Sequence, residues 1–248
     1  MKILIINNNL KEDNALIPYA FRMARDLESR VHVMHILDRR NMGNIYSGIS
    51  DSQTLSPKVL SPDEIIKKEK IGANKYLDKK VSREASVLNY PLKVDYEVVT
   101  DKIESRVLFE SGRSEYDMIV MSSTPDGSMF QDLRDIHFVV NRSKCPVYLV
   151  PDNRVYVNPD KILIASFRNK SESEELNETF KILNPLKVKP KFIKSTEAAR
   201  IGKDPEKDKI VDLLVILRNR PNIFEIMFKP RVTTLLRRNR DIPVLVIH

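Results

Sequence analysis

The sequence predicts an α/β protein made of two doubly wound parallel-sheet units, the first with five strands and the second with about four. A repeat is the first observation behind this prediction: residues 116–151 begin YDMIVMSS and end SKCPVYLVP, and residues 211–248 begin VDLLVILR and end RDIPVLVIH. Each copy has an apolar run opened by Asp, an amphipathic stretch, and an apolar run opened by Pro-Val. Such short, continuous apolar runs are the second observation, because they are typical of parallel strands covered on both faces.

The duplication reaches the start of each unit, where KILIINNN from Lys2 matches KILIASFR from Lys161. The offset between copies is 159 residues from Lys2 to Lys161 but 95 from Asp117 to Asp212, so the second copy lacks 64 residues. The missing part corresponds roughly to residues 39–100. We therefore expect a complete domain at 1–151, a linker at 152–158 and a truncated domain at 159–248.

Helix and strand signals alternate along the first unit, which favours right-handed crossovers in a doubly wound sheet. Asn14 is a candidate cap for the first helix, and Ser61, Pro62 and Glu64 form a helix start of the capping-box type. A loop that contains Ser, Asn and Gly is expected over residues 39–60, between the strand near 31–38 and the helix that starts at Ser61. The expected strands lie near 3–6, 31–38, 94–98, 118–121 and 147–150, and further helices near 102–111 and 129–142.

The second unit has fewer elements. We expect strands from Ile162, Val188, Leu213 and Val244, with helices at 173–183, 197–201 and 222–238. Pro190 falls inside the second of these strands and cannot donate to a sheet ladder. This strand is therefore predicted to be a sheet edge, where its Lys residues and Pro190 would discourage pairing with other chains.

The last strand of each unit is apolar on both faces and carries no charge, so it would be an aggregation hazard if left exposed. We expect the two to associate as an internal pseudo-dimer, with Val147, Leu149, Val244 and Val246 at the contact.

Composition excludes several classes of protein. The net charge is +8, but the basic residues are interspersed with acidic ones and lack interleaved aromatics, so we do not expect a nucleic-acid partner. No apolar run approaches the ~20 residues needed to cross a bilayer, so no membrane partner is expected. The strand-like start and the single cysteine, Cys145, indicate a cytoplasmic location.

Together these features resemble a tandem universal stress protein with a truncated second copy. The resemblance rests on KILI near each start, on HVMHILD in the first unit, and on DMIVM followed 29 residues after its Asp by Pro-Val, with DLLVI as the counterpart. In the nucleotide-binding branch of that family, the resemblance implies an Asp after the first strand and a loop G-x2-G-x9-G-[ST] after the fourth. Glycines there let main-chain amides approach the phosphates.

Both copies depart from this ATP pattern. Asn8 and Phe167 stand where the acidic residue is expected, and the second copy has Leu217, Arg220 and Pro230 at the loop glycines. The first copy has Ser122 and Pro125 and keeps only Gly127 as a flexible point.

A rebuilt pocket in the first domain stays open as an alternative, because ligands bind at the carboxyl ends of strands in such sheets. Its candidate residues are Asn7, Asn8, Ser122, Ser123, Gly127 and Ser128. The competing interpretation is a polar β-turn at residues 124–127.

No catalytic or metal centre is predicted. His32 and His35 lie three apart on a strand and hence on opposite faces. No G-x-S-x-G elbow is present, and Cys145 has no His and acid partners nearby in sequence. We expect a non-enzymatic protein without a cofactor, acting in stress response or signalling through a protein partner or a small ligand. The alternative is an ATP- or AMP-binding protein that uses the rebuilt pocket.

Overall fold

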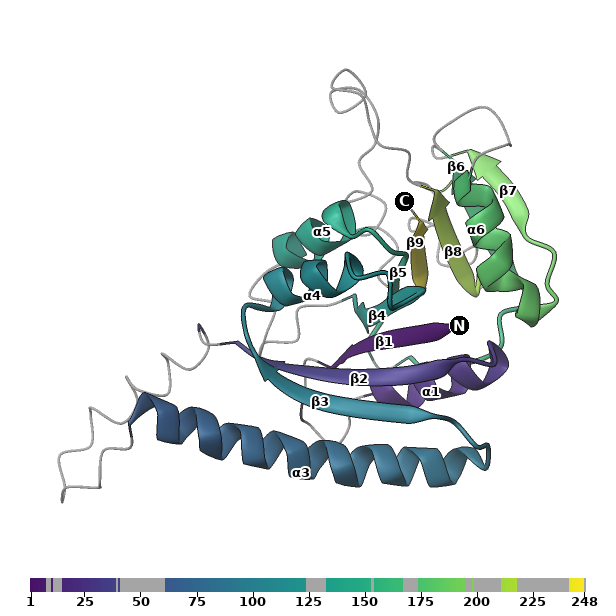
Figure 1. Cartoon of the computed structure of the whole chain (residues 1–248). Coiled ribbons are helices and arrows are strands. Elements are labelled where there is room, and N and C mark those ends of the chain that lie inside the picture. Colours follow the sequence, from purple (N-terminus) through teal and green to yellow (C-terminus); the bar gives the residue numbers. More distant parts are fainter. Residues whose placement is uncertain are drawn as a thin grey trace.

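The structure is a computed structural model that describes residues 1–7, 10, 15–38, 40, 61–123, 133–152, 154–166, 174–194, 198, 211–217 and 241–247. Its described strands form one sheet of nine, in the order β3-β2-β1-β4-β5-β9-β8-β6-β7. Figure 1 shows this sheet continuing from the N-terminal strands to those near the C-terminus. The two predicted units therefore share a single sheet.

The N-terminal part supplies five parallel strands in the order typical of a doubly wound fold. The strands are β1 (Lys2–Asn7), β2 (Arg30–Leu37), β3 (Val94–Thr100), β4 (Met118–Ser122) and β5 (Val147–Val150). The helices are α1 (Leu16–Asp26), α3 (Pro62–Leu88), α4 (Ile103–Ser111) and α5 (Leu133–Arg142).

The C-terminal part supplies four strands that are parallel to one another. They are β6 (Ile162–Ser166), β7 (Lys191–Lys194), β8 (Leu213–Leu217) and β9 (Val244–Ile247), with helix α6 (Glu174–Leu183) and the 3-10 turn η1 (Asn184–Leu186). β7 lies at the sheet edge, as the sequence predicts. The expected position of Pro190 is wrong, however, because the strand begins after it, at Lys191. The helices expected at 197–201 and 222–238 and the loop at 39–60 fall mainly outside the described residues.

The two parts meet where β5 pairs with β9 in the antiparallel direction. Val147 lies opposite Val246 and Leu149 opposite Val244, which joins the four residues expected at this contact. All four are buried, so the pairing leaves no apolar strand at the middle of the sheet open to solvent.

Helices cover both faces of the sheet and divide the core in two. One face packs against α1, α3 and α6, and the other packs against α4 and α5. Continuous apolar strands such as β1 and β4 are buried on both sides, which is why they lack the alternation of a half-exposed strand.

Local sequence sets the helix starts to different degrees. At α3, Ser61 Oγ accepts from Glu64 N and the Glu64 carboxylate accepts from Ser61 N, which confirms the predicted capping box. At α1 the cap position is Ala15, one residue after the predicted cap Asn14, and it makes no side-chain cap. None of the described helices is long and apolar enough to span a membrane.

Candidate functional site

The predicted pocket lies where β1 and β4 end side by side. Asn7 is the last residue of β1 and Ser122 the last of β4, and the two strands are parallel neighbours. Both side chains are buried. The sheet thus brings Asn7, Ser122 and Ser123 together at the carboxyl ends of β1 and β4. Asn8, Gly127 and Ser128 lie outside the described residues.

Polar groups at the end of β4 are bound within the protein. Ser122 Oγ donates to Asp152 Oδ1 at 2.8 Å, and the main-chain amide of Ser123 donates to the carbonyl of Val150 at 2.8 Å. The Ser123 amide is therefore already used by a carbonyl, and a carboxylate lies at the carboxyl end of β4. Both features disfavour a phosphate at this position.

Sequence reasoning placed Asp152 in the linker and missed its contact with Ser122. A signal was present, because β4 and β5 were both expected as parallel neighbours. The residues that follow two such strands emerge at the same edge of the sheet. Asp152 comes two residues after the end of β5 and is therefore within reach of Ser122.

A neutral histidine supports the end of β1. His35 Nδ1 lies 2.9 Å from the carbonyl oxygen of Asn7. Burial lowers the pKa of His35 to about 4, so the ring is uncharged at neutral pH and must use an N–H to donate to that carbonyl. His35 therefore provides no positive charge for an anionic ligand.

His32 lies on the opposite face of β2, as predicted. Its Nδ1 is 2.6 Å from the hydroxyl of Tyr116, and its Nε2 is 3.5 Å from Glu97 Oε1. Burial lowers its pKa despite the neighbouring carboxylate. The two histidines cannot share a ligand, and among the described residues no group of three or more His, Cys, Asp and Glu could hold a metal ion.

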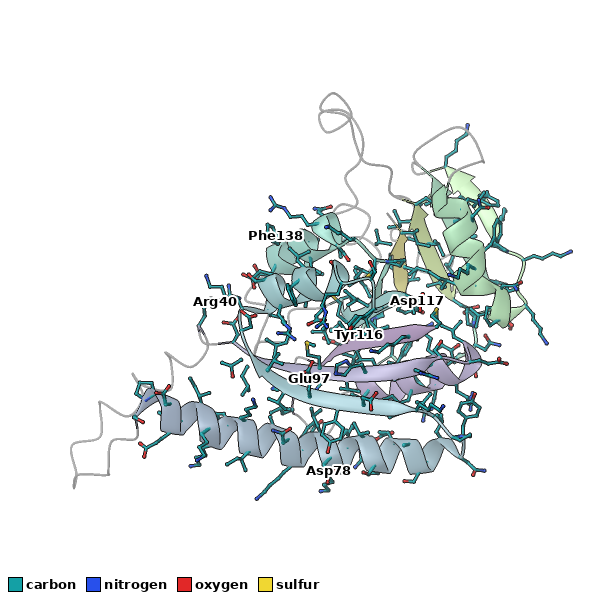
Figure 2. The ribbon with its side chains drawn as sticks, in the orientation of Figure 1. Arg40, Asp78, Glu97, Tyr116, Asp117 and Phe138 are labelled. Carbon is teal, nitrogen blue, oxygen red and sulfur yellow. The ribbon has the colours of Figure 1, made fainter. Side chains whose placement is uncertain are left out.

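The buried carboxylate of Asp38, the residue after β2, is paired with Arg40. Figure 2 labels Arg40 near this end of β2. Arg40 binds Glu104 with both terminal nitrogens, at 2.9 and 2.7 Å, and its Nε donates to Asp38 Oδ1 at 3.0 Å. Asp38 Oδ2 also accepts from Ile103 N at the start of α4. Burial alone would raise the pKa of Asp38, but the hydrogen bonds from Arg40 and Ile103 lower it. This arginine is therefore held between two carboxylates and serves the packing of α4.

The comparisons with known proteins concern the family and the fold. Residues 1–151 match the model of the universal stress protein family. The chain belongs to this family. A search of curated proteins returns no match.

Solved structures show the same fold over both parts of the chain. A universal stress protein from Archaeoglobus fulgidus is 13% identical with a TM-score of 0.60, covering 99% of this chain and 95% of that one. A functionally unknown protein from Pseudomonas aeruginosa PAO1 is 12% identical with a TM-score of 0.56, covering 99% and 91%. At these identities the likeness concerns the fold.

Proposed function

We propose that this universal stress protein is non-enzymatic and acts in stress response or signalling by binding a protein partner or a small ligand, without ATP as a cofactor. Membership of the family supports the role in stress response. In this proposal the β5–β9 contact makes an internal pseudo-dimer of a complete and a truncated copy.

One observation carries the exclusion of ATP: the Ser122–Asp152 hydrogen bond at the end of β4. Ser122 occupies the position where the family pattern has a phosphate-loop glycine, and here its hydroxyl holds a carboxylate. A phosphate arriving at this point would meet a negative charge instead of a glycine-lined row of amides. The main-chain amide of Ser123, bound to Val150, points to the same conclusion.

One side chain, that of Ser123, favours a second candidate function, which is nucleotide binding in a rebuilt pocket. The hydroxyl of Ser123 is buried and has no hydrogen-bond partner among the described residues. A buried hydroxyl in this state calls for an explanation, and a ligand is one. ATP or AMP would then be held by Asn7, Ser123 and the residues that follow.

Thermal unfolding with Mg²⁺ and ATP, ADP or AMP separates the two functions. At about 1 mM ligand, a Kd of about 10 μM would stabilise the protein by about 2.7 kcal/mol. For a chain of this size, that is a rise in Tm of roughly 5–10 °C. The proposed function predicts no such rise for any of the three nucleotides.

Two matched variants make the result specific. If a nucleotide does raise Tm, Ser123→Ala should reduce the rise in the rebuilt-pocket model, whereas Ser86→Ala on the exposed side of α3 should leave it unchanged. A rise that depends on Ser123 would replace the ATP-free proposal with the second function.

A further inference from the structure

The two outer strands of the sheet carry opposite charges. β3 ends the sheet on one side and contains Asp95 and Glu97, and β7 ends it on the other side and contains Lys191 and Lys194. Figure 1 shows them at opposite ends of the sheet. Among the described residues no strand pairs with the outer side of either one. Such edges present main-chain donors and acceptors that can pair with another chain.

The direction of the strands allows a second copy to extend the sheet. β1 to β5 are parallel, the direction reverses once between β5 and β9, and β6 to β9 are parallel again. β7 is therefore antiparallel to β3. A second copy that is shifted along the sheet and rotated to follow its twist brings its β7 beside β3 of the first, antiparallel to it and with the same face toward α1 and α3.

The aromatic residues of the two edges share a face. Tyr96 is in register with Val33, and Phe192 is in register with Ile164. Val33 and Ile164 belong to the same buried cluster beneath α1, α3 and α6. Tyr96 is 38% exposed and Phe192 is 51% exposed, so both rings are accessible at the sheet ends.

The charged residues share the other face. Glu97 is in register with Met34 and Lys191 with Leu163, and both of these partners pack in the cluster beneath α4 and α5. In an antiparallel pair, residues directly opposite each other lie on one face. Placing Tyr96 opposite Phe192 therefore places Glu97 opposite Lys191.

We propose that copies of this chain associate end to end through β3 and β7, with Tyr96 facing Phe192 and Glu97 facing Lys191. The four residues of β7, Lys191–Lys194, then match the four residues 94–97. An aromatic pair and an ion pair at directly opposed positions both stabilise an antiparallel ladder. The partner is thus a second copy of the same protein.

Charge also explains why the edges would not pair with themselves. Two β7 strands would oppose Lys to Lys, and two β3 strands would bring carboxylates together, which destabilises a ladder. The lysines of β7 thus discourage pairing with most strands but favour pairing with an acidic strand such as β3. Each β3–β7 contact leaves one β3 and one β7 open, so association continues beyond two copies.

Sedimentation velocity and light scattering of the full chain test the proposal, over about 10 to 500 μM protein at low salt. The average mass should rise with concentration without stopping at two copies. It should fall toward a single chain at about 0.5 M salt, because exposed charge pairs are screened there.

Charge reversal gives the decisive test. Glu97→Lys and Lys191→Glu should each weaken association about tenfold, because an attraction becomes a repulsion. A mixture of the two variants should associate again, since every contact in it can pair opposite charges. Asp95→Lys provides a second reversal on β3 that leaves the Glu97 contacts to His32 and Arg106 intact, and Lys67→Glu on α3 is the control with unchanged association.

Two results would overturn the proposal. One is a single-chain mass at every concentration and salt. The other is self-association that none of the reversals weakens and that mixing does not restore, with circular dichroism showing that each variant is folded.

Discussion

The main-chain amide of Lys2 donates a 2.7 Å hydrogen bond to Oδ2 of Asp117, and the amide of Asp117 donates back to the Lys2 carbonyl at 2.9 Å. Lys161 and Asp212 repeat this exchange at 2.9 and 3.0 Å. In each case the Asp precedes a central buried strand and fixes the start of its parallel neighbour. The repeated Asp found in the sequence thus has the same structural task in both halves, which supports a duplication.

Asp117→Ala should lower the free energy of unfolding by about 1.5 kcal/mol, at the low end of the roughly 1.5–3 kcal/mol typical of hydrogen bonds to a charged group, because this bond is exposed. Asp212→Ala should cost a similar amount. Asp117→Asn and Asp212→Asn keep an acceptor oxygen and should cost less. Urea unfolding checks the order, and equal losses for Ala and Asn would contradict a role for the hydrogen bond.

The sequence predicted the β5–β9 contact because both strands lack charged residues. Residues 147–150 and 244–247 contain no charge, so an exposed edge at either strand would have been costly. The absence of charge required each strand to be paired or covered, and the place of each strand at the end of its expected sheet indicated that the two pair with each other. β7 was predicted as an edge for a different reason: Pro190, expected inside that strand, cannot donate to a sheet ladder.

Replacing Leu149 and Val246 together with Lys should separate the two parts of the sheet or precipitate the protein. Both side chains are buried at the centre of the sheet, where an unpaired ammonium is strongly disfavoured. Small-angle scattering measures the separation. Val155→Lys and Val157→Lys are suitable controls because these residues are exposed. A double variant as compact as its parent would show that the contact does not hold the parts together.

Acid should destabilise the protein through His35. Its folded pKa of about 4 lies below the unfolded value of about 6.5, so the unfolded chain binds more protons between these pH values. The contribution of His35 to the free energy of unfolding is therefore fully present above about pH 6.5. It is lost as the pH falls toward 4, and the loss is at most about 3 kcal/mol.

His35→Phe isolates this effect. The variant should show a flatter dependence of unfolding free energy on pH between 6.5 and 4 than the parent, whatever its absolute stability. Denaturant titrations at several pH values provide the measurement. Parallel curves for the two proteins would assign the acid sensitivity to other groups.

The site was harder to predict than the fold because its contacts join residues far apart in sequence. Ser122 and Asp152 are separated by 30 positions, and only the expected parallel arrangement of the strands that precede them connects the two residues. Tyr156 is a similar case. The local stretch VYVNP looks like a linker, yet its tyrosine is buried beside α1, since the sheet beyond β5 provides a surface that the local sequence does not reveal.

Tyr156 should hold the segment between the two parts in place. Its ring meets Tyr19 of α1 edge-to-face, with centroids 5.2 Å apart and planes at 88°, and Tyr19 Oη lies 2.9 Å from Tyr148 Oη on β5. Removing a buried ring costs about 3–5 kcal/mol, so Tyr156→Ala should destabilise the protein by roughly that amount. Its neighbour Val155 is 64% exposed, and Val155→Ala should change stability by less than about 0.5 kcal/mol. Urea unfolding of the two variants provides the comparison. If both changes are equally mild, residues 152–158 act as a passive linker and the aromatic contact does not contribute to stability.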